Sequence, residues 1–141
     1  MEYSFFTLLF RTAHAQRNYM RPHLSELGLS PGQPKILRCL ATFGPSSQRT
    51  LADYCEVDPS AICRILDNME SKGFLSRKTS NSDRRAEEIS LTKKGFETFE
   101  KWERQCIELE NKMLPGISEK EKQKLSELLS KVYKNMLKDI S

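Results

Sequence analysis

Apolar residues recur at helical spacing along most of this 141-residue chain. Near the N-terminus they predict an amphipathic helix over residues 3–20, which Pro22 is expected to kink or interrupt and Gly28 to end. Near the C-terminus a capping box at Ser118–Glu121 opens a second long amphipathic helix. The apolar side of this last helix consists of Leu125, Leu128, Leu129, Val132, Tyr133, Met136, Leu137 and Ile140.

A third long helix is predicted from a cap at Thr92 to about Leu114. Its apolar residues have the spacing of a heptad seam: Phe99, Trp102, Cys106, Leu109 and Met113. Together the long helices carry more apolar surface than a small domain covers, and exposed apolar surface marks an interface. We therefore expect a symmetric homodimer. Its interface is expected to contain Phe5, Phe6 and Leu9 together with the apolar side of the last helix.

The middle of the chain predicts shorter helices. Ser30 is expected to cap a helix with Pro31 in its first turn. The apolar side of that helix is Ile36, Leu37, Leu40 and Phe43. A helix from Gln48 to Cys55, capped by Ser46 or Ser47, follows.

A tight turn at Glu56-Val57 leads into a further helix from Pro59 to Lys72, which Asp58 is expected to cap. The buried side of this helix is predicted to be Ile62, Leu66 and Met69. Two short helices joined by a tight turn form a helix-turn-helix.

The residues after this pair predict a β-hairpin. Phe74 to Thr79 reads as a strand, residues 80–83 supply turn residues, and Ile89 and Leu91 alternate with polar residues. A helix-turn-helix followed directly by a hairpin is a winged helix. The predicted fold is therefore mainly α with a small β-hairpin wing, flanked by N- and C-terminal dimerisation helices.

Charge is concentrated beside this motif. The segment Ser71–Arg85 holds five cationic residues and one aspartate, a net charge of +4, which equals the net charge of the whole chain. A short basic segment next to a helix-turn-helix is the electrostatic footprint of a nucleic-acid-binding protein.

Other features limit the class of protein. No apolar run approaches the length of a membrane span, and the N-terminus lacks the basic region of a signal peptide, so we expect a cytoplasmic protein without a membrane partner. The four cysteines form no Cys-x-x-Cys pair, and neither histidine lies near one in sequence. We therefore expect reduced thiols, no metal site and no cofactor.

The outward side of the Pro59–Lys72 helix is the candidate base-reading surface. It presents Ser60, Ala61, Arg64 and Asn68. Arginine pairs with guanine, asparagine with adenine, and an alanine methyl contacts thymine. Ser60 at the helix start suits a phosphate. The alternative is an ordinary solvated polar surface.

The wing supplies the second set of candidates. One of Arg84 and Arg85 is expected in the minor groove, where negative potential is strong, with Asp83 bracing it. Arg77 and Lys78 are expected to contact phosphate, which positions the protein without reading sequence. The helix start Gln48, Arg49 and Thr50 is expected to do the same. A solvated charged turn is the alternative for the wing.

Among the cysteines, Cys39, Cys55 and Cys106 lie on apolar sides of their helices, which favours packing. Cys63 flanks the outward side of its helix beside Arg64, whose charge favours a thiolate. An inert thiol is the alternative to a redox sensor at this position.

The sequence resembles the MarR family of bacterial winged-helix transcription regulators over essentially its full length. The matching pieces are Leu27–Gln33 with Leu37, Leu51-Ala52, Val57–Ser60, Met69–Leu75 with Arg77, Asp83–Arg85, and Ile89–Gly95. The resemblance implies that the wing's Asp-x-Arg pair sends its arginine into the minor groove and that the helix after the turn enters the major groove. It also implies a dimer formed by the first helix and the last two. Glu56 departs from the smaller residue often found in that turn.

In this family small aromatic or lipophilic ligands bind between the dimer helices and the winged-helix part. The resemblance therefore makes His14, Arg17 and Met20 candidates for lining such a pocket, with surface or interface residues as the alternative. Some relatives sense peroxide through a cysteine in the first helix, but residues 1–30 contain no cysteine.

These observations predict one MarR-like unit over residues 1–141, with a DNA-binding part at 30–92 and helical dimerisation parts at 1–27 and 93–141. We expect a sequence-specific regulator that binds a near-palindromic duplex as a homodimeric repressor and is released by a small lipophilic or aromatic ligand. The alternatives are the same fold without a ligand, a cysteine-based redox-responsive regulator, and a winged helix used for protein contacts. An enzyme is not expected, because the sequence has no phosphate loop and no motif pairing a nucleophile with a base.

Overall fold

The structure, a computed structural model, describes residues 2–80 and 83–138, with the side chains of 80 and 83–86 not among those described. The elements in chain order are α1 (Phe5–Glu26), α2 (Gln33–Phe43), β1 (Ser46–Ser47), α3 (Gln48–Cys55), α4 (Pro59–Ser71), β2 (Leu75–Ser80), β3 (Asp83–Leu91), α5 (Lys93–Met113) and α6 (Glu119–Lys138). The chain divides into two units, residues 1–106 and 107–141. The predicted mainly helical fold with a small wing is confirmed.

Helix α1 begins after a cap in which the Ser4 hydroxyl oxygen accepts the Thr7 N–H at 3.2 Å. It continues through Pro22 to Glu26, so the predicted interruption at Pro22 is wrong. Proline has no N–H, but this removes only one backbone hydrogen bond of a helix that spans 22 residues. The chain leaves the helix through Gly28, whose φ of 71° lies in the left-handed region.

The start of α2 differs from the prediction. The capping residue is Gly32, with φ of 90°, and the proline of the first turn is Pro34 rather than Pro31. Ser30 does not cap the helix with its side chain. Instead its backbone N–H donates to Oε1 of Gln33 at 3.0 Å, so the glutamine side chain supplies the hydrogen-bond acceptor for this N–H.

The caps predicted for the helix-turn-helix are confirmed. The Ser47 hydroxyl accepts the Thr50 N–H at 3.1 Å, and Asp58 Oδ1 accepts the Ser60 N–H at 3.1 Å. Glu56 ends α3 with φ of 55°, a left-handed conformation that an ordinary side chain rarely adopts. The tight turn between α3 and α4 therefore forms even though Glu56, rather than a smaller residue, adopts this conformation.

The core lies between α2, α3, α4 and the sheet. Its fully buried large side chains include Ile36, Leu37, Leu40, Leu51, Ile62, Leu66, Met69, Phe74, Leu75 and Ile89. The predicted inward side of α4 is confirmed, as is the predicted position of Cys55 on the apolar side of α3. Phe43, predicted on the apolar side of α2, is instead exposed, because it is the last residue of that helix and its ring packs edge-on against Tyr54 at the surface.

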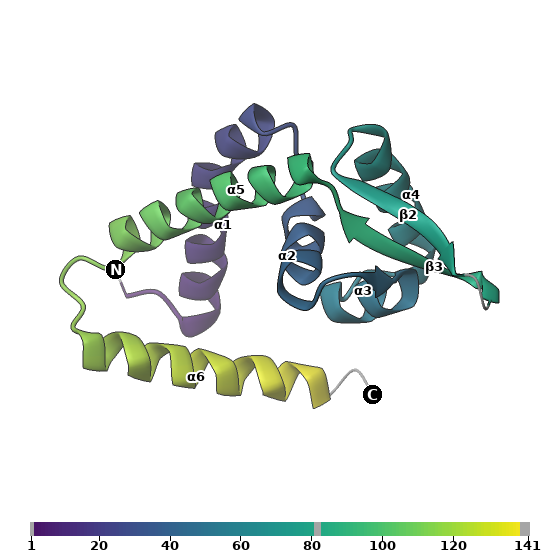
Figure 1. Ribbon diagram of the computed structural model, residues 1–141. Coiled ribbons are helices and arrows are strands. Elements are labelled where there is room, and N and C mark those ends of the chain that lie inside the picture. Colours follow the sequence, from purple (N-terminus) through teal and green to yellow (C-terminus); the bar gives the residue numbers. More distant parts are fainter. Residues whose placement is uncertain (1, 81–82, 139–141) are drawn as a thin grey trace. The chain divides into compact units, whose positions relative to one another are not determined.

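The sheet has three strands in the order β1-β3-β2, all antiparallel. The short strand β1 was not predicted; it pairs Ser46 with Ile89 and so ties the start of α3 to the hairpin. In the hairpin, Leu75 pairs with Leu91 and Arg77 with Ile89. Figure 1 shows the hairpin of β2 and β3 lying alongside α4 and α3, with its far end projecting beyond these helices.

A close backbone contact joins the hairpin to α5. The Thr92 N–H donates to the Phe74 carbonyl at 3.1 Å, and the Thr92 hydroxyl accepts the Gly95 N–H at 3.1 Å, which confirms the predicted cap. A Cβ on Gly95 would lie 2.1 Å from the Phe74 carbonyl oxygen. Only glycine permits this approach.

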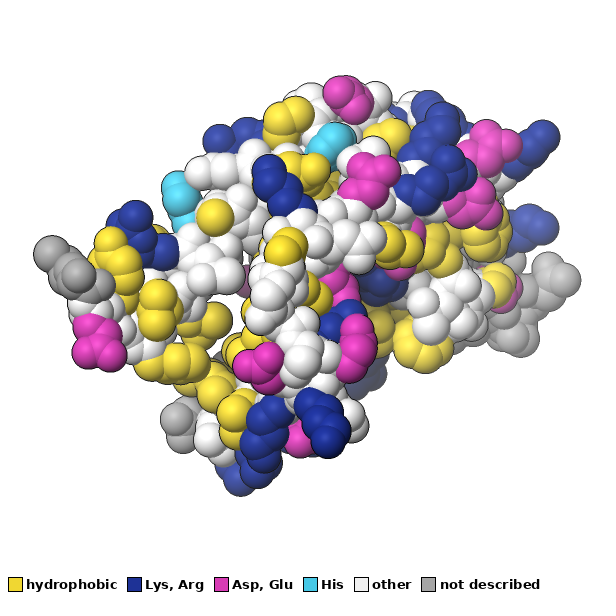
Figure 2. All heavy atoms as spheres, turned by 90° about the vertical axis from the view of Figure 1, so that its left-hand side faces the viewer, with side chains coloured by type: hydrophobic (Ala, Val, Ile, Leu, Met, Phe, Trp, Pro, Cys, Tyr) yellow, Lys and Arg dark blue, Asp and Glu magenta, His cyan; other side chains and the backbone are white. Residues whose placement is uncertain are grey.

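The second unit contains α6, which begins at the predicted capping box. The Ser118 N–H donates to Glu121 at 3.0 Å, the Glu121 N–H returns to the serine hydroxyl at 3.2 Å, and the bonds from Ser118 lower the pKa of Glu121. No residue of α6 is buried within the chain. Figure 2 shows hydrophobic side chains exposed on one face of the molecule. Within the described residues, no helix is both long and apolar enough to cross a membrane.

We predict that replacing Gly95 with Ala destabilises the fold. Alanine normally stabilises a helix relative to glycine by about 1 kcal/mol, but the clash with the Phe74 carbonyl forces the backbone to move. We expect a net loss of about 3 kcal/mol in the free energy of unfolding, measured by urea denaturation. The matched control is Lys101→Ala, at an exposed position of the same helix. Equal stability of the Gly95→Ala protein would contradict the close contact.

Candidate nucleic-acid interface

Helix α4 presents a polar surface opposite its buried side. Ser60, Arg64 and Asn68 are exposed and Ala61 is half-buried, whereas Ile62, Leu66 and Met69 are buried. Within the described part of the chain, Arg64 takes part in no ion pair. The start of α4 is positive because of its unpaired N–H groups, and Asp58 satisfies one of them.

Asn68 is held by a residue that the sequence analysis missed. The side-chain Nε2 of Gln33, at the start of α2, donates to Asn68 Oδ1 at 2.7 Å. Gln33 itself is buried and accepts the Ser30 N–H through Oε1. Only the folded structure identifies Gln33 as the partner of Asn68, because 35 residues separate the two in sequence.

The start of α3 lies beside α4. The Gln48 side-chain amide donates to the Cys63 sulfur at 2.9 Å, so one predicted phosphate contact is engaged within the protein. The Thr50 hydroxyl accepts a hydrogen bond from Ser47 at 2.9 Å. Arg49 is exposed. Of the three predicted contacts in this stretch, Arg49 therefore offers the most accessible donor.

Arg77 lies among three carboxylates. Its guanidinium is 2.7 Å from Asp67, 3.9 Å from Glu70 and 3.8 Å from Glu87, and only 16% of its side chain is exposed. Asp67 and Glu70 belong to α4, whereas Glu87 belongs to β3. Arg77 therefore connects α4 to the hairpin, and the predicted phosphate contact at Arg77 must compete with three acidic partners.

The remaining wing candidates differ in what the structure describes. Lys78 is exposed on β2 and pairs in register with Glu88 of β3. The side chains of Asp83, Arg84 and Arg85 lie outside the described residues, so their predicted contacts stay predictions. Their backbone opens strand β3.

The cysteines separate by burial. Cys39 and Cys55 are buried, as predicted, and burial, reinforced by the neighbouring Cys39 thiol, raises the pKa of Cys55 to about 11. Burial and then Glu103 raise the pKa of the half-buried Cys106. Cys63 is exposed on α4. Burial also raises the pKa of Cys39. The thiols with raised pKa values therefore stay protonated at neutral pH: Cys39, Cys55 and Cys106. Cys63 remains as the accessible thiol.

The three residues proposed for a ligand pocket lie on α1 but differ in exposure. His14 and Arg17 are exposed and Met20 is buried. His14 Nε2 is 3.0 Å from the Asn18 amide nitrogen, and its ring stacks with Phe10. Their role toward a ligand stays a prediction. Among the described residues, no group of three His, Cys, Asp or Glu side chains is placed to bind a metal ion.

Known proteins resemble this chain in sequence and in structure. Residues 29–86 match the model of the MarR family. The chain is 29% identical over 132 residues to the HTH-type transcriptional regulator BilQ of Clostridium symbiosum, covering 94% of this chain and 90% of BilQ.

Two solved structures share the fold. The MepR–DNA complex of S. aureus matches with a TM-score of 0.85 and 20% identity, covering 95% of this chain and 99% of MepR. NadR in complex with 4-hydroxyphenylacetate matches with a TM-score of 0.74 and 22% identity, covering 93% of each chain. At these identities the likeness establishes the winged-helix fold.

We predict that Arg77→Met weakens DNA binding while every phosphate contact is kept. Without its ion pairs the wing is no longer tied to α4, and we expect about tenfold weaker binding, the scale of one charged hydrogen bond. The dependence of log K on log salt concentration should keep its slope, because only the removal of a phosphate contact lowers that slope, by about 0.9 for each one. Fluorescence anisotropy at several salt concentrations measures both quantities.

The control is Lys78→Met, which removes an exposed positive charge from the same strand. A predicted phosphate contact at Lys78 should lower the slope by about 0.9 when it is removed. If Arg77→Met lowers the slope by the same amount, Arg77 binds phosphate and the interpretation of its three ion pairs as a brace is wrong.

Proposed function

We propose that this chain is a member of the MarR family of transcription regulators, whose model residues 29–86 match, and that it acts as a homodimeric repressor that binds a near-palindromic DNA operator. The observation that carries the proposal is the outward side of α4, where Arg64 is exposed without a described ion pair, while Arg38 and Arg77 are paired with carboxylates. An arginine kept free at this place suits a bidentate contact with guanine in the major groove.

We propose that residues 30–92 bind DNA and that residues 1–27 and 93–141 form the dimer. Support comes from apolar side chains that the single chain leaves uncovered. Phe5, Phe6 and Leu9 of α1 are exposed, as are Leu125, Leu128, Leu129, Tyr133, Met136 and Leu137 of α6, and Val132 is half-buried. Ile140, also proposed for the interface, lies outside the described residues. A second copy of the chain would cover these side chains.

Two recognition helices in such a dimer would enter successive major grooves, with half-sites about 34–36 Å apart. Arg84 and Arg85 of each wing are proposed to reach the adjacent minor groove. Lys78, Arg49 and Ser60 are proposed to contact phosphate. These contacts are proposed to act in the cytoplasm.

We further propose that a small lipophilic or aromatic ligand releases the operator. NadR, which shares the fold, was solved with 4-hydroxyphenylacetate. To release DNA, a ligand must bind the two arrangements of the dimer with different affinity, typically by about 1–3 kcal/mol of coupling.

A second candidate function is regulation by oxidation. Its support is the exposed Cys63 thiol, which lies on the recognition helix and accepts a hydrogen bond from Gln48 of α3. A bulky adduct at this sulfur would lie on the DNA-facing side of α4. Loss of operator binding after treatment with peroxide, absent in Cys63→Ser, would select this candidate over release by a ligand.

We expect that selection from a random duplex pool at near-physiological salt yields a palindrome with half-sites one helical turn apart. The reason is the two-fold symmetry of the proposed dimer. Sequencing of the selected pool is the measurement. Weak binding that is independent of sequence and highly sensitive to salt would contradict the proposal.

Replacing Arg64 with Ala should weaken binding to the selected operator by about 1–3 kcal/mol and relax the preference at one base pair. Affinities for the operator and for random DNA are compared by anisotropy. Arg104→Ala is the control, because Arg104 is exposed on α5. Equal losses on operator and random DNA would show that Arg64 contacts the backbone rather than a base.

A further inference from the structure

An ion pair joins α2 to α5 within the first unit. The guanidinium of Arg38 on α2 pairs with the Glu103 carboxylate on α5, 65 residues further along the chain. Across the described residues, no other ion pair links these two helices. Helix α2 also packs against α3 of the helix-turn-helix. The Arg38 side chain therefore attaches the helix-turn-helix to α5.

Arg38 contacts successive turns of α5. Its guanidinium carbon lies 5.6 Å from the centre of the Phe99 ring, and Glu103 and Cys106 follow Phe99 on the same side of α5. Burial and then Glu103 raise the pKa of the Cys106 thiol, while the charge and hydrogen bonding of Arg38 oppose this rise. A planar guanidinium can stack on a ring and pair with a carboxylate through its edge, whereas an ammonium group has neither a flat face nor a fork of donors.

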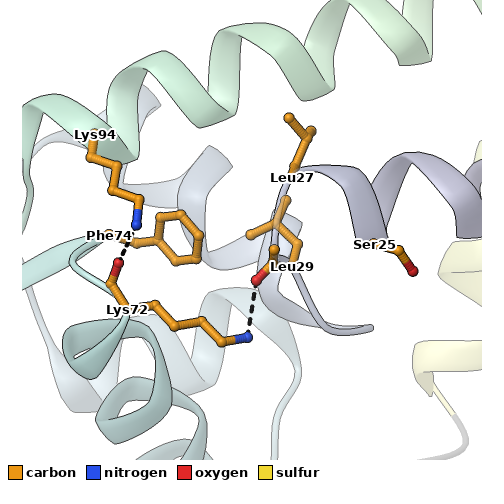
Figure 3. Close-up of a pocket in the computed structure, with 7 residues that line it drawn as sticks. Ser25, Leu27, Leu29, Lys72, Phe74 and Lys94 are labelled. Carbon is orange, nitrogen blue, oxygen red and sulfur yellow. Dashed lines mark hydrogen bonds between the residues drawn. The ribbon is translucent and has the colours of Figure 1, made fainter.

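The start of α5 is attached to the winged helix at a separate place. Gly95 lies directly against the Phe74 carbonyl. Lys94 Nζ donates to the carbonyl of Lys72, which caps α4, at 2.6 Å, and Figure 3 shows both lysine side chains beside Phe74. Glu103 follows Gly95 by eight residues, which is about 12 Å along a helix that rises about 1.5 Å per residue. The two attachments are therefore well separated along α5.

Two separated attachments determine the direction of a helix. A helix held at one point can pivot about that point, whereas a second contact along its length prevents the rotation. Helix α2 is in turn attached to α4, because Gln33 Nε2 donates to Asn68 Oδ1 at 2.7 Å. The contacts of Arg38 therefore relate the direction of α5 to that of α4.

The ion pair contributes little to the stability of the fold. The Arg38 and Glu103 side chains are 42% and 31% exposed, and ion pairs that solvent reaches add little to the free energy of unfolding. Helix α2 is held instead by its apolar side, where Leu37 and Cys39, the neighbours of Arg38 in sequence, are fully buried. The main effect of the ion pair is therefore on the angle between helices.

We propose that Arg38 is a positioning residue for operator recognition. Through Phe99 and Glu103 it holds α4 at one angle to α5, a continuous helix that runs from the first unit into the second. In the proposed dimer, on which this inference rests, the two copies of this angle set the separation of the two recognition helices. Arg38 thereby restricts the half-site spacing that the protein accepts, without contacting DNA.

The test uses the selected operator and duplexes whose half-sites are moved apart or together by one base pair. The unsubstituted chain should prefer the selected spacing. Arg38→Met should reduce this preference by about tenfold, the scale of one charged hydrogen bond, and change binding to a duplex with a single half-site by about twofold or less. Glu103→Gln should have the same effect. Fluorescence anisotropy measures each affinity.

Two further variants test whether the contacts themselves matter. Arg104→Met is the matched control, because Arg104 is exposed beside Glu103 on α5 and its substitution removes the same charge. Arg38→Lys keeps the charge and removes the planar guanidinium, so part of the spacing preference should be lost. Denaturation in urea should show that Arg38→Met is as stable as Arg104→Met.

A measurement without DNA separates this inference from the proposed function. Residual dipolar couplings of the backbone amides in the full chain report the angle between α4 and α5. The couplings of both helices should fit one alignment tensor in the unsubstituted chain and in Arg104→Met, but not in Arg38→Met. Failure to find an operator would overturn the proposed function, and the couplings would still decide whether Arg38 sets this angle.

Three outcomes would overturn the inference. The first is an unchanged angle between α4 and α5 in Arg38→Met. The second is an equal loss of affinity at every half-site spacing, which would show that Arg38 acts on DNA binding in general. The third is an equal effect of Arg104→Met on the spacing preference, which would show that the net charge of the protein, rather than the contacts of Arg38, is responsible.

Discussion

The contact between the Phe74 carbonyl and Gly95 is the constraint on which the junction of α4, the hairpin and α5 depends. It places the start of α5 directly against the start of β2, with no side chain between the two backbones. Phe74 also receives the chain from α4, since its N–H donates to the Met69 carbonyl at 2.9 Å. Helix α4, the hairpin and α5 thus diverge from a few adjacent peptide groups.

Electrostatics in this fold are less uniform than the net charge suggests. The basic segment Ser71–Arg85 carries +4 by counting, but Arg77 is surrounded by Asp67, Glu70 and Glu87. Its charge is therefore offset locally, and carboxylates remain beside the outward side of α4. Among the described side chains near this helix and hairpin, Arg64 on α4 and Lys78 on β2 are exposed cations.

Local chemistry made much of the fold predictable. The caps at Ser47, Asp58, Thr92 and Ser118 depend only on neighbouring residues, as does the buried side of α4. Ser30 was mispredicted as a cap because a glycine with positive φ and a glutamine side chain can satisfy the same helix start.

Contacts between residues distant in sequence were beyond prediction. Strand β1 has two residues and is defined only by its partner β3. The partners of Arg77 come from two elements, and only folding brings them together. For the candidate site, residue types on α4 were predictable from helical spacing, whereas which side-chain atoms remain available was not.

The hydrogen bond from Gln33 to Asn68 restricts the orientation of a polar side chain on the outward side of α4. The Ser30 N–H requires an acceptor, which fixes Oε1 of Gln33 toward it and leaves Nε2 to donate to Asn68 Oδ1. Asn68 is exposed, and its Oδ1 keeps a second lone pair beside the bond from Gln33, while its amide NH₂ remains a donor. A two-point contact with adenine uses one donor and one acceptor of this kind. The bond from Gln33 would therefore fix the plane of the Asn68 amide before a base approaches, so that less side-chain freedom is lost on contact.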